Sequence, residues 1–160
     1  MNIPQVKLLK GTHPETGQTG QGCFMNVIAY LNNEPVITDQ SECVCFTIRP
    51  LAIWANDWMT DEERPQLLPF ILRAMGSRTH ENAEMMRRLN LVVAFADQMA
   101  VYAAKYAKYA EYAATYAKSA EGRKQIMVSL LALFDAALPP LEKIDRQVIE
   151  RMRTLEAMAA

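Results

Sequence analysis

Residues 100–120, AVYAAKYAKYAEYAATYAKSA, identify this protein as a helical one. The run contains neither proline nor glycine and consists mainly of strong helix formers. It lies inside a longer run of the same kind, residues 79–120, which predicts a single helix roughly 60 Å long at 1.5 Å per residue. Because that is longer than a small domain is wide, part of the helix is expected to protrude.

The tyrosines of this run share one face of the predicted helix. At 100° per residue they fall within an arc of about 120°, and alanines occupy the neighbouring arc. The alanine arc favours close packing against another helix, whereas the tyrosine rings pack and their hydroxyl groups need a partner. We expect most of the tyrosine arc to face the protein's own core and its margin to face a partner or ligand. The predicted binding residues are Tyr106, Tyr109, Tyr112, Tyr116, Lys105 and Lys108.

The composition indicates one folded domain. Of the 160 residues, 51% are hydrophobic and 22% are charged, which excludes a disordered chain. The formal net charge is −1, so no overall positive field attracts nucleic acid. The N-terminal residues lack a signal-peptide pattern, and the most apolar stretch, residues 89–104, contains Asp97 and falls short of the ~20 residues of a membrane span. We therefore expect a cytoplasmic protein, in its own cell or in a host, without a membrane or nucleic acid partner.

Glycine and proline positions divide the rest of the chain. Residues 1–22 are predicted to form an irregular N-terminal arm with a short extended piece at residues 6–9. Residues 23–160 are predicted to form a single helical domain. A first helix is predicted over residues 23–31, and a second over 43–59 with a kink or a start at Pro50.

The remaining boundaries follow from capping and breaking residues. Thr60 and Glu63 form a capping box that opens a third helix, which ends at Gly76. Gly122 is predicted to end the long helix, and further helices are predicted over residues 123–138 and after Pro140. The expected fold is all-α, a bundle of about six helices built around the long one.

Three cysteines offer a candidate metal site. Cys23, Cys43 and Cys45, completed by His13, would make a tetrahedral zinc site. Paired zinc ligands usually lie two to four residues apart, however, and a buried free cysteine is an ordinary small hydrophobic residue. The prediction is therefore no cofactor, with zinc as the alternative.

No arrangement of residues typical of a catalytic centre stands out. His80 and Glu84 are one pair, where a di-iron helical bundle needs several. Glu62 and Glu63 are explained by the helix cap, and the carboxylate pairs of Mg²⁺ chemistry are missing. The sequence favours a protein that is not an enzyme.

Eight short segments stand out between residues 22 and 76: Gly22-Cys-Phe-Met, Ala29-Tyr-Leu, Glu34-Pro, Thr38-Asp, Cys43-Val-Cys, Asn56-Asp, Leu67-Leu-Pro and Gly76. Together they resemble a group of small uncharacterised proteins of bacteriophages and actinobacteria. The resemblance covers about residues 20–80 and the alanine- and aromatic-rich style of 100–120. Phe46 is a departure, since the group often has proline there. No activity is assigned to the group, so the resemblance implies a phage-type origin and no mechanism.

Three functions follow as expectations. The leading one is a non-enzymatic, phage-type accessory protein that binds a host or defence protein, with a homo-oligomer through the long helix as a variant. The first alternative is a small-ligand or nucleotide-binding protein that uses tyrosine stacking with Lys105, Arg87 or Arg88. The second alternative is a metal-supported protein or enzyme built on the three cysteines.

Overall fold

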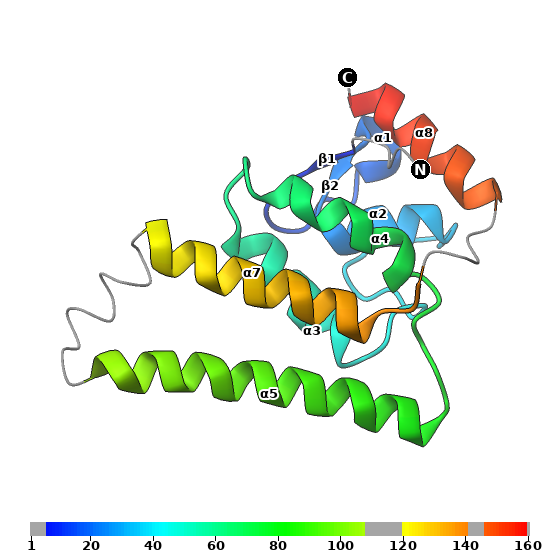
Figure 1. The fold of residues 1–160 in the computed structure, drawn as a ribbon. Helices are drawn as coiled ribbons and strands as arrows, with labels where there is room; N and C mark the ends of the chain where they lie inside the picture. Colours follow the sequence, from blue (N-terminus) through cyan, green and yellow to red (C-terminus); the bar gives the residue numbers. More distant parts are fainter. Residues whose placement is uncertain (1–5, 108–119, 141–145, 160) are drawn as a thin grey trace.

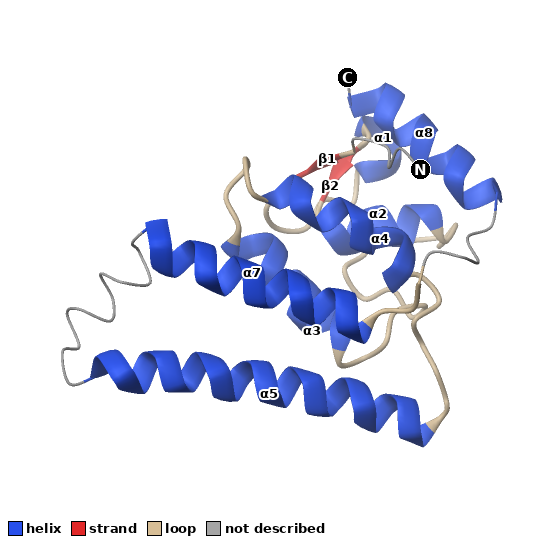
Figure 2. Cartoon of the chain, viewed as in Figure 1, coloured by secondary structure: helices blue, strands red, loops and turns tan. Residues whose placement is uncertain are grey.

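The computed structural model describes residues 6–107, 120–140 and 146–159 of the chain, which are mostly helical (Figures 1 and 2). The predicted all-α class is confirmed, and the strands among the described residues form one two-stranded parallel sheet. In chain order the elements are β1 (Lys7–Leu8), α1 (Thr16–Thr19), β2 (Gln21–Gly22), α2 (Phe24–Leu31), α3 (Ile48–Trp58), the 3₁₀ turn η1 (Arg64–Leu67), α4 (Leu68–Ala74), α5 (Asn82–Ala107), α7 (Ala120–Ala137) and α8 (Arg146–Ala159).

Helix α2 lies at the centre of the fold, as its apolar sequence predicts. Every residue of α2 except Tyr30 is buried, and its neighbours are α3 and α4. Cys23 caps the helix, because its sulfur accepts the amide hydrogen of Asn26 at 3.4 Å. The helix predicted over residues 23–31 is confirmed.

Three phenylalanine rings join α2, α4 and α7 into one core. Phe134 of α7 is fully buried and packs against Phe70 of α4, with ring centroids 5.5 Å apart. On its other side Phe24 of α2 lies 6.3 Å away. Offset ring pairs of this kind add to the free energy gained by burial alone.

Prolines set the starts of the two middle helices. Pro50 lies in the first turn of α3, where its missing amide hydrogen costs no helical hydrogen bond. Pro65 and Pro69 occupy the first turns of η1 and α4, so the predicted third helix is divided into a 3₁₀ turn and an α-helix.

The capping box is half formed: Glu63 accepts the amide hydrogen of Thr60 at 2.9 Å, while Thr60 offers its carbonyl oxygen to the amide of Arg64.

The N-terminal arm is more regular than the sequence suggests. The predicted extended piece is β1, which pairs in parallel with β2 and buries Val6 and Leu8. Side chains of α3 hold the arm in place: the Asn56 amide donates to the Leu9 carbonyl at 2.9 Å, and Asp57 accepts the Gly11 amide at 2.9 Å. The arm is therefore part of the core.

A buried arginine completes this attachment. Arg64 is 2% exposed, and its guanidinium donates to the carbonyl oxygens of Asn56 and Met59, both at 2.8 Å, near the end of α3. It also donates to the Leu8 carbonyl at 3.3 Å and to Asp61 at 2.5 Å. One side chain thus satisfies carbonyl groups from the arm and from a helix end that would otherwise lack partners.

Helices α5 and α7 lie side by side and run antiparallel (Figure 1). The prediction of one helix over residues 79–120 falls partly on residues 108–119, which lie outside the described part of the chain; the described part of this run belongs to α5 as far as Ala107 and to α7 from Ala120. The predicted break at Gly122 is wrong, because this residue is buried within α7. A single glycine in a helix costs only about 1 kcal/mol, which burial of the α7 apolar face offsets.

The two ends of the described chain lie together (Figure 1). Helix α8 packs against α1, β2 and α2. Its Met152 is fully buried, and Arg151 donates to the Leu31 carbonyl at the end of α2 at 2.7 Å.

Candidate functional site

The predicted tyrosine site falls largely outside the described part of the structure. Tyr109, Tyr112, Tyr116 and Lys108 lie outside the described residues. The backbone of Lys105 and Tyr106 belongs to α5, but their side chains also lie outside what is described. The tyrosine stripe as a binding surface therefore stays a prediction.

Arg87 and Arg88, which the sequence offered as ligand-binding residues, have structural partners. Arg88 is 4% exposed and donates to the Ser77 carbonyl and, at 2.8 Å, to Glu84. Arg87 donates to the Ala136 carbonyl at the end of α7 at 2.8 Å and to Glu84 at 2.7 Å. Both side chains attach the start of α5 to its neighbours, which argues against a role in ligand binding.

Glu84 makes the stability of this junction dependent on pH. Hydrogen bonds from Arg87, with the charge of Arg88, lower the pKa of Glu84 from 4.5 to about 2. A carboxyl group whose pKa is lower in the folded state stabilises the fold above its unfolded pKa, and loses that contribution as the pH falls through the folded pKa. We expect this contribution to disappear between about pH 4.5 and pH 2.

The Glu84→Gln variant tests this. It should be less stable than the unmodified protein at pH 7, by about 1–2 kcal/mol, and the two should converge as the pH falls below 4.5. Denaturant unfolding at a series of pH values measures the difference. Hydrogen bonds from Arg123 also lower the pKa of Glu63, so Glu63→Gln is a matched comparison. Parallel pH curves for the unmodified protein and Glu84→Gln would contradict the expectation.

The outer face of α5 carries exposed apolar side chains. Met86, Leu89 and Val93 are 53%, 37% and 48% exposed, and their spacing of three and four residues places them on one side of the helix. The opposite side holds the buried residues Arg88 and Phe95, the latter in edge contact with Trp54 at 6.3 Å. Helix α5 thus carries apolar side chains on part of its exposed face as well as on its packed face. We call Met86, Leu89 and Val93 the α5 outer face.

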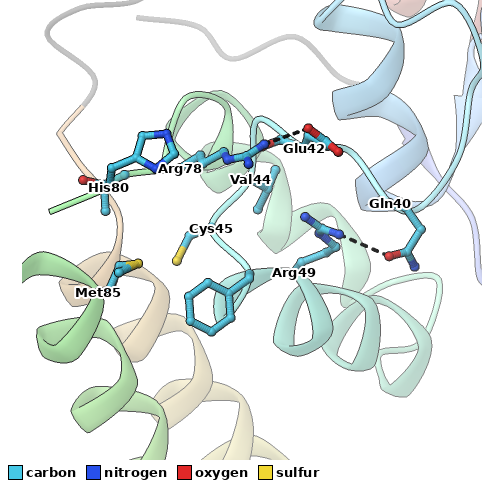
Figure 3. A pocket seen from close by; sticks show the side chains of 10 residues that line it. Gln40, Glu42, Val44, Cys45, Arg49, Arg78, His80 and Met85 are labelled. Carbon is cyan, nitrogen blue, oxygen red and sulfur yellow. Dashed lines mark hydrogen bonds and ion pairs between the residues drawn. The ribbon is translucent and has the colours of Figure 1, made fainter. Parts of the chain in front are cut away.

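A cavity lies where the loop before α3, the segment after α4 and the start of α5 meet (Figure 3). Its volume is about 380 Å³, which falls within the range of about 300–1,000 Å³ typical of small-molecule sites. We call it the Arg49–Arg78 cavity. Its lining residues are Gln40, Glu42, Val44, Cys45, Phe46, Arg49, Arg78, Thr79, His80 and Met85.

Two arginines on different segments dominate the electrostatics of this cavity. Arg49, in the first turn of α3, donates to Gln40 at 3.2 Å, and Arg78, after α4, donates to Glu42 at 2.8 Å (Figure 3). All ten lining residues are described, and Glu42 is the one carboxylate among them. Two guanidinium groups and one carboxylate leave one net positive charge, without counting His80.

Cys45 lines the same cavity and has an unusual environment. Burial opposes ionisation of its thiol, but hydrogen bonds from Thr47, Arg88 and the amide of Ile48 outweigh this and lower its pKa. Its sulfur lies 3.1 Å from the Thr47 hydroxyl. Thiols at the start of a helix and beside arginine are commonly activated in this way.

The structure does not bring the candidate zinc ligands of the alternative reading together. Among the described residues no group of three His, Cys, Asp or Glu side chains is placed to hold an ion. All three cysteines are free. Cys23 contacts Asn26 and Cys43 contacts Ser41, while His13 lies between Glu15 and the Lys10 carbonyl.

Sequence reasoning missed Arg49, Arg78 and Phe46 as a group. Phe46 and Arg49 are three residues apart, but Arg78 lies 29 residues further along the chain and joins them only when the segment after α4 packs beside the start of α3. In the sequence, Phe46 stands out only as a departure from the pattern of the expected resemblance. It is 60% exposed, which is unusual for a phenylalanine.

Comparison with known proteins adds no further assignment. In the described parts of the chain, no helix has the length and hydrophobicity needed to cross a membrane. No protein family, curated protein or solved structure matches the chain.

Proposed function

We propose that this protein acts without catalysis, as a phage-type accessory protein that binds a host or defence protein through the α5 outer face. The observation that carries the proposal is the position of α5. This helix packs one side on α7, and its other side presents Met86, Leu89 and Val93 to solvent. Apolar residues exposed at helical spacing are the side chains that helix-in-groove interfaces use as anchors.

The contacts of the start of α5 support this use. Arg87, Arg88 and Glu84 fix the first turns of the helix to α7 and to Ser77. A surface on a fixed helix loses little conformational entropy on binding, and this favours affinity. Exposure of Met86 adds a side chain that adapts to irregular partner surfaces.

Affinity capture with paired variants tests the proposal. The double variant Leu89→Lys/Val93→Lys places two charges on the α5 outer face, while Val36→Lys places one charge on a residue that is 66% exposed outside any helix. From a bacterial lysate, the unmodified protein and Val36→Lys should capture the same protein, and the double variant should lose it by tenfold or more, about 1.4 kcal/mol.

Equal capture by all three proteins would contradict the proposal. Light scattering of the purified proteins provides the second readout. Self-association that is present in the unmodified protein and lost in Leu89→Lys/Val93→Lys would assign the α5 outer face to a second copy of this chain instead.

A further inference from the structure

The residues that line the Arg49–Arg78 cavity are different from those of the α5 outer face. Its lining combines two arginines, one exposed aromatic ring and several apolar side chains. Six of the ten lining residues are polar or charged, so the walls are more polar than those of a typical small-molecule site and suit a ligand with a charged group.

The arginines retain unused hydrogen-bonding capacity. A guanidinium carries five N–H donors, and the contacts with Gln40 and Glu42 use the Nη1 atoms of Arg49 and Arg78. The Nε atom of Arg49 is buried and has no hydrogen-bond partner among the described residues. A buried donor without a partner costs free energy, so a small reorientation of Arg49 toward an acceptor in the cavity is favourable.

The partner that suits these donors is an anion. Arginine binds carboxylate and phosphate groups through two parallel hydrogen bonds, which a neutral ligand does not match. The lining carries more positive than negative charge, and the pair of Arg78 with Glu42 is exposed. An exposed ion pair contributes little to stability, so a ligand can replace Glu42 as the partner of Arg78 at low cost.

The apolar part of the lining indicates what else the ligand carries. Val44 is buried, Met85 is half-buried, and Phe46 is 60% exposed. Figure 3 shows Val44, Cys45 and Met85 around the open space between the two arginines and α5. An aromatic ring in the ligand would remove part of the Phe46 surface from water and would stack on the phenyl or the guanidinium planes.

We propose that the Arg49–Arg78 cavity binds small aromatic anions. A carboxylate or phosphate group lies between the guanidinium groups of Arg49 and Arg78, and the aromatic part of the ligand contacts Phe46, Val44 and Met85. This activity is independent of the α5 outer face.

Isothermal titration of the full chain with simple probes tests the proposal. Phenyl phosphate and benzoate carry both features, inorganic phosphate carries the anion alone, benzyl alcohol the ring alone, and benzamidine a ring with the opposite charge. At least one of the two aromatic anions should bind about tenfold more tightly than each of the other three probes. Whichever of phenyl phosphate and benzoate binds more tightly identifies the preferred anionic group as phosphate or carboxylate. Aromatic anions that bind no more tightly than inorganic phosphate or benzyl alcohol would overturn the proposal.

Single substitutions locate the binding. Arg49→Gln and Arg78→Gln should each weaken binding of the aromatic anion about tenfold, as expected for loss of a charge-assisted hydrogen bond. Phe46→Ser should weaken it toward the affinity for inorganic phosphate. The control is Arg153→Gln on α8, whose side chain is 67% exposed and lies outside the cavity lining.

Two further measurements keep the result interpretable. Circular dichroism confirms that each variant is folded, and amide chemical shifts of Cys45, Phe46 and Arg78 should move on titration of the unmodified protein. Unchanged affinity in both arginine variants, or shifts confined to other segments, would overturn the proposal. Leu89→Lys/Val93→Lys should bind the probes normally, so failure of the protein-binding function and failure of this site are distinguishable.

Discussion

Replacement of Arg64 by methionine should lower the free energy of unfolding by about 3–5 kcal/mol, because three carbonyl groups lose a buried hydrogen-bond donor at once. Methionine keeps most of the apolar stem of arginine but none of its donors. The carbonyl oxygens of Asn56, Met59 and Leu8 would then be left without the partner that they have in the folded protein. Each buried group without a partner costs roughly 1–3 kcal/mol.

Denaturant unfolding of Arg64→Met measures this loss. Arg153→Met is the matched control, because Arg153 is exposed and pairs only with Glu150 at 3.2 Å among the described residues; it should change stability by less than about 0.5 kcal/mol. Arg64→Lys separates charge from geometry: it keeps the charge without the planar fork, and should still lose much of the stability. A stability of Arg64→Met within about 1 kcal/mol of the unmodified protein would contradict the role given to this side chain.

Phe134→Ala should have the next largest effect. Phe134 is fully buried between Phe70 and Phe24, so truncation leaves a cavity at the point where α2, α4 and α7 meet. Substitutions of buried phenylalanine by alanine typically cost about 3–5 kcal/mol. In a chain of this length that corresponds to a fall in melting temperature of roughly 10 °C.

The control for Phe134→Ala lies on the same helix. Val128 of α7 is 56% exposed, and Val128→Ala should change the free energy of unfolding by less than about 0.5 kcal/mol. Thermal and denaturant unfolding of the two variants measures the contrast. Similar small losses for both would show that the three rings do not form the centre of the core.

The all-α class and most of the helices could be predicted from the sequence, because the local sequence patterns of these helices agree with the way the helices pack. In α2, the apolar spacing and the asparagine-rich end both indicate the helix that is observed. Pro50, Pro65 and Pro69 act within their own turns, so their effect is visible without knowledge of the fold. At Gly122 the local signal indicates a break, and burial in α7 overrides it.

That α5 and α7 form an antiparallel pair could not be predicted from the sequence. Residues 79–120 have helix-forming composition throughout, and nothing in that composition indicates that α7 packs antiparallel to α5. This pairing is favoured by non-local burial, for example of Phe95 and Leu130. Helix propensity does not contain this information.

The candidate site could be predicted even less well, because it too depends on packing between distant parts of the chain. The Arg49–Arg78 cavity exists because a loop before α3 meets the segment after α4, and the two are about thirty residues apart in the sequence. The motif Asn56-Asp, which the resemblance to phage proteins drew attention to, has a structural role here: both side chains hold the N-terminal arm. In this protein the Asn56-Asp motif therefore serves the attachment of the N-terminal arm.

The contact between α8 and the N-terminal segments has a consequence for how the protein is made. Arg151 and Met152 contribute to the end of α2 and to the core from positions more than a hundred residues later in the chain. A ribosome therefore releases α2 and the arm long before the helix that covers them exists. During that interval the growing chain exposes apolar surface that chaperones recognise, and a chain truncated before α8 would retain that exposure and become a substrate for proteolysis.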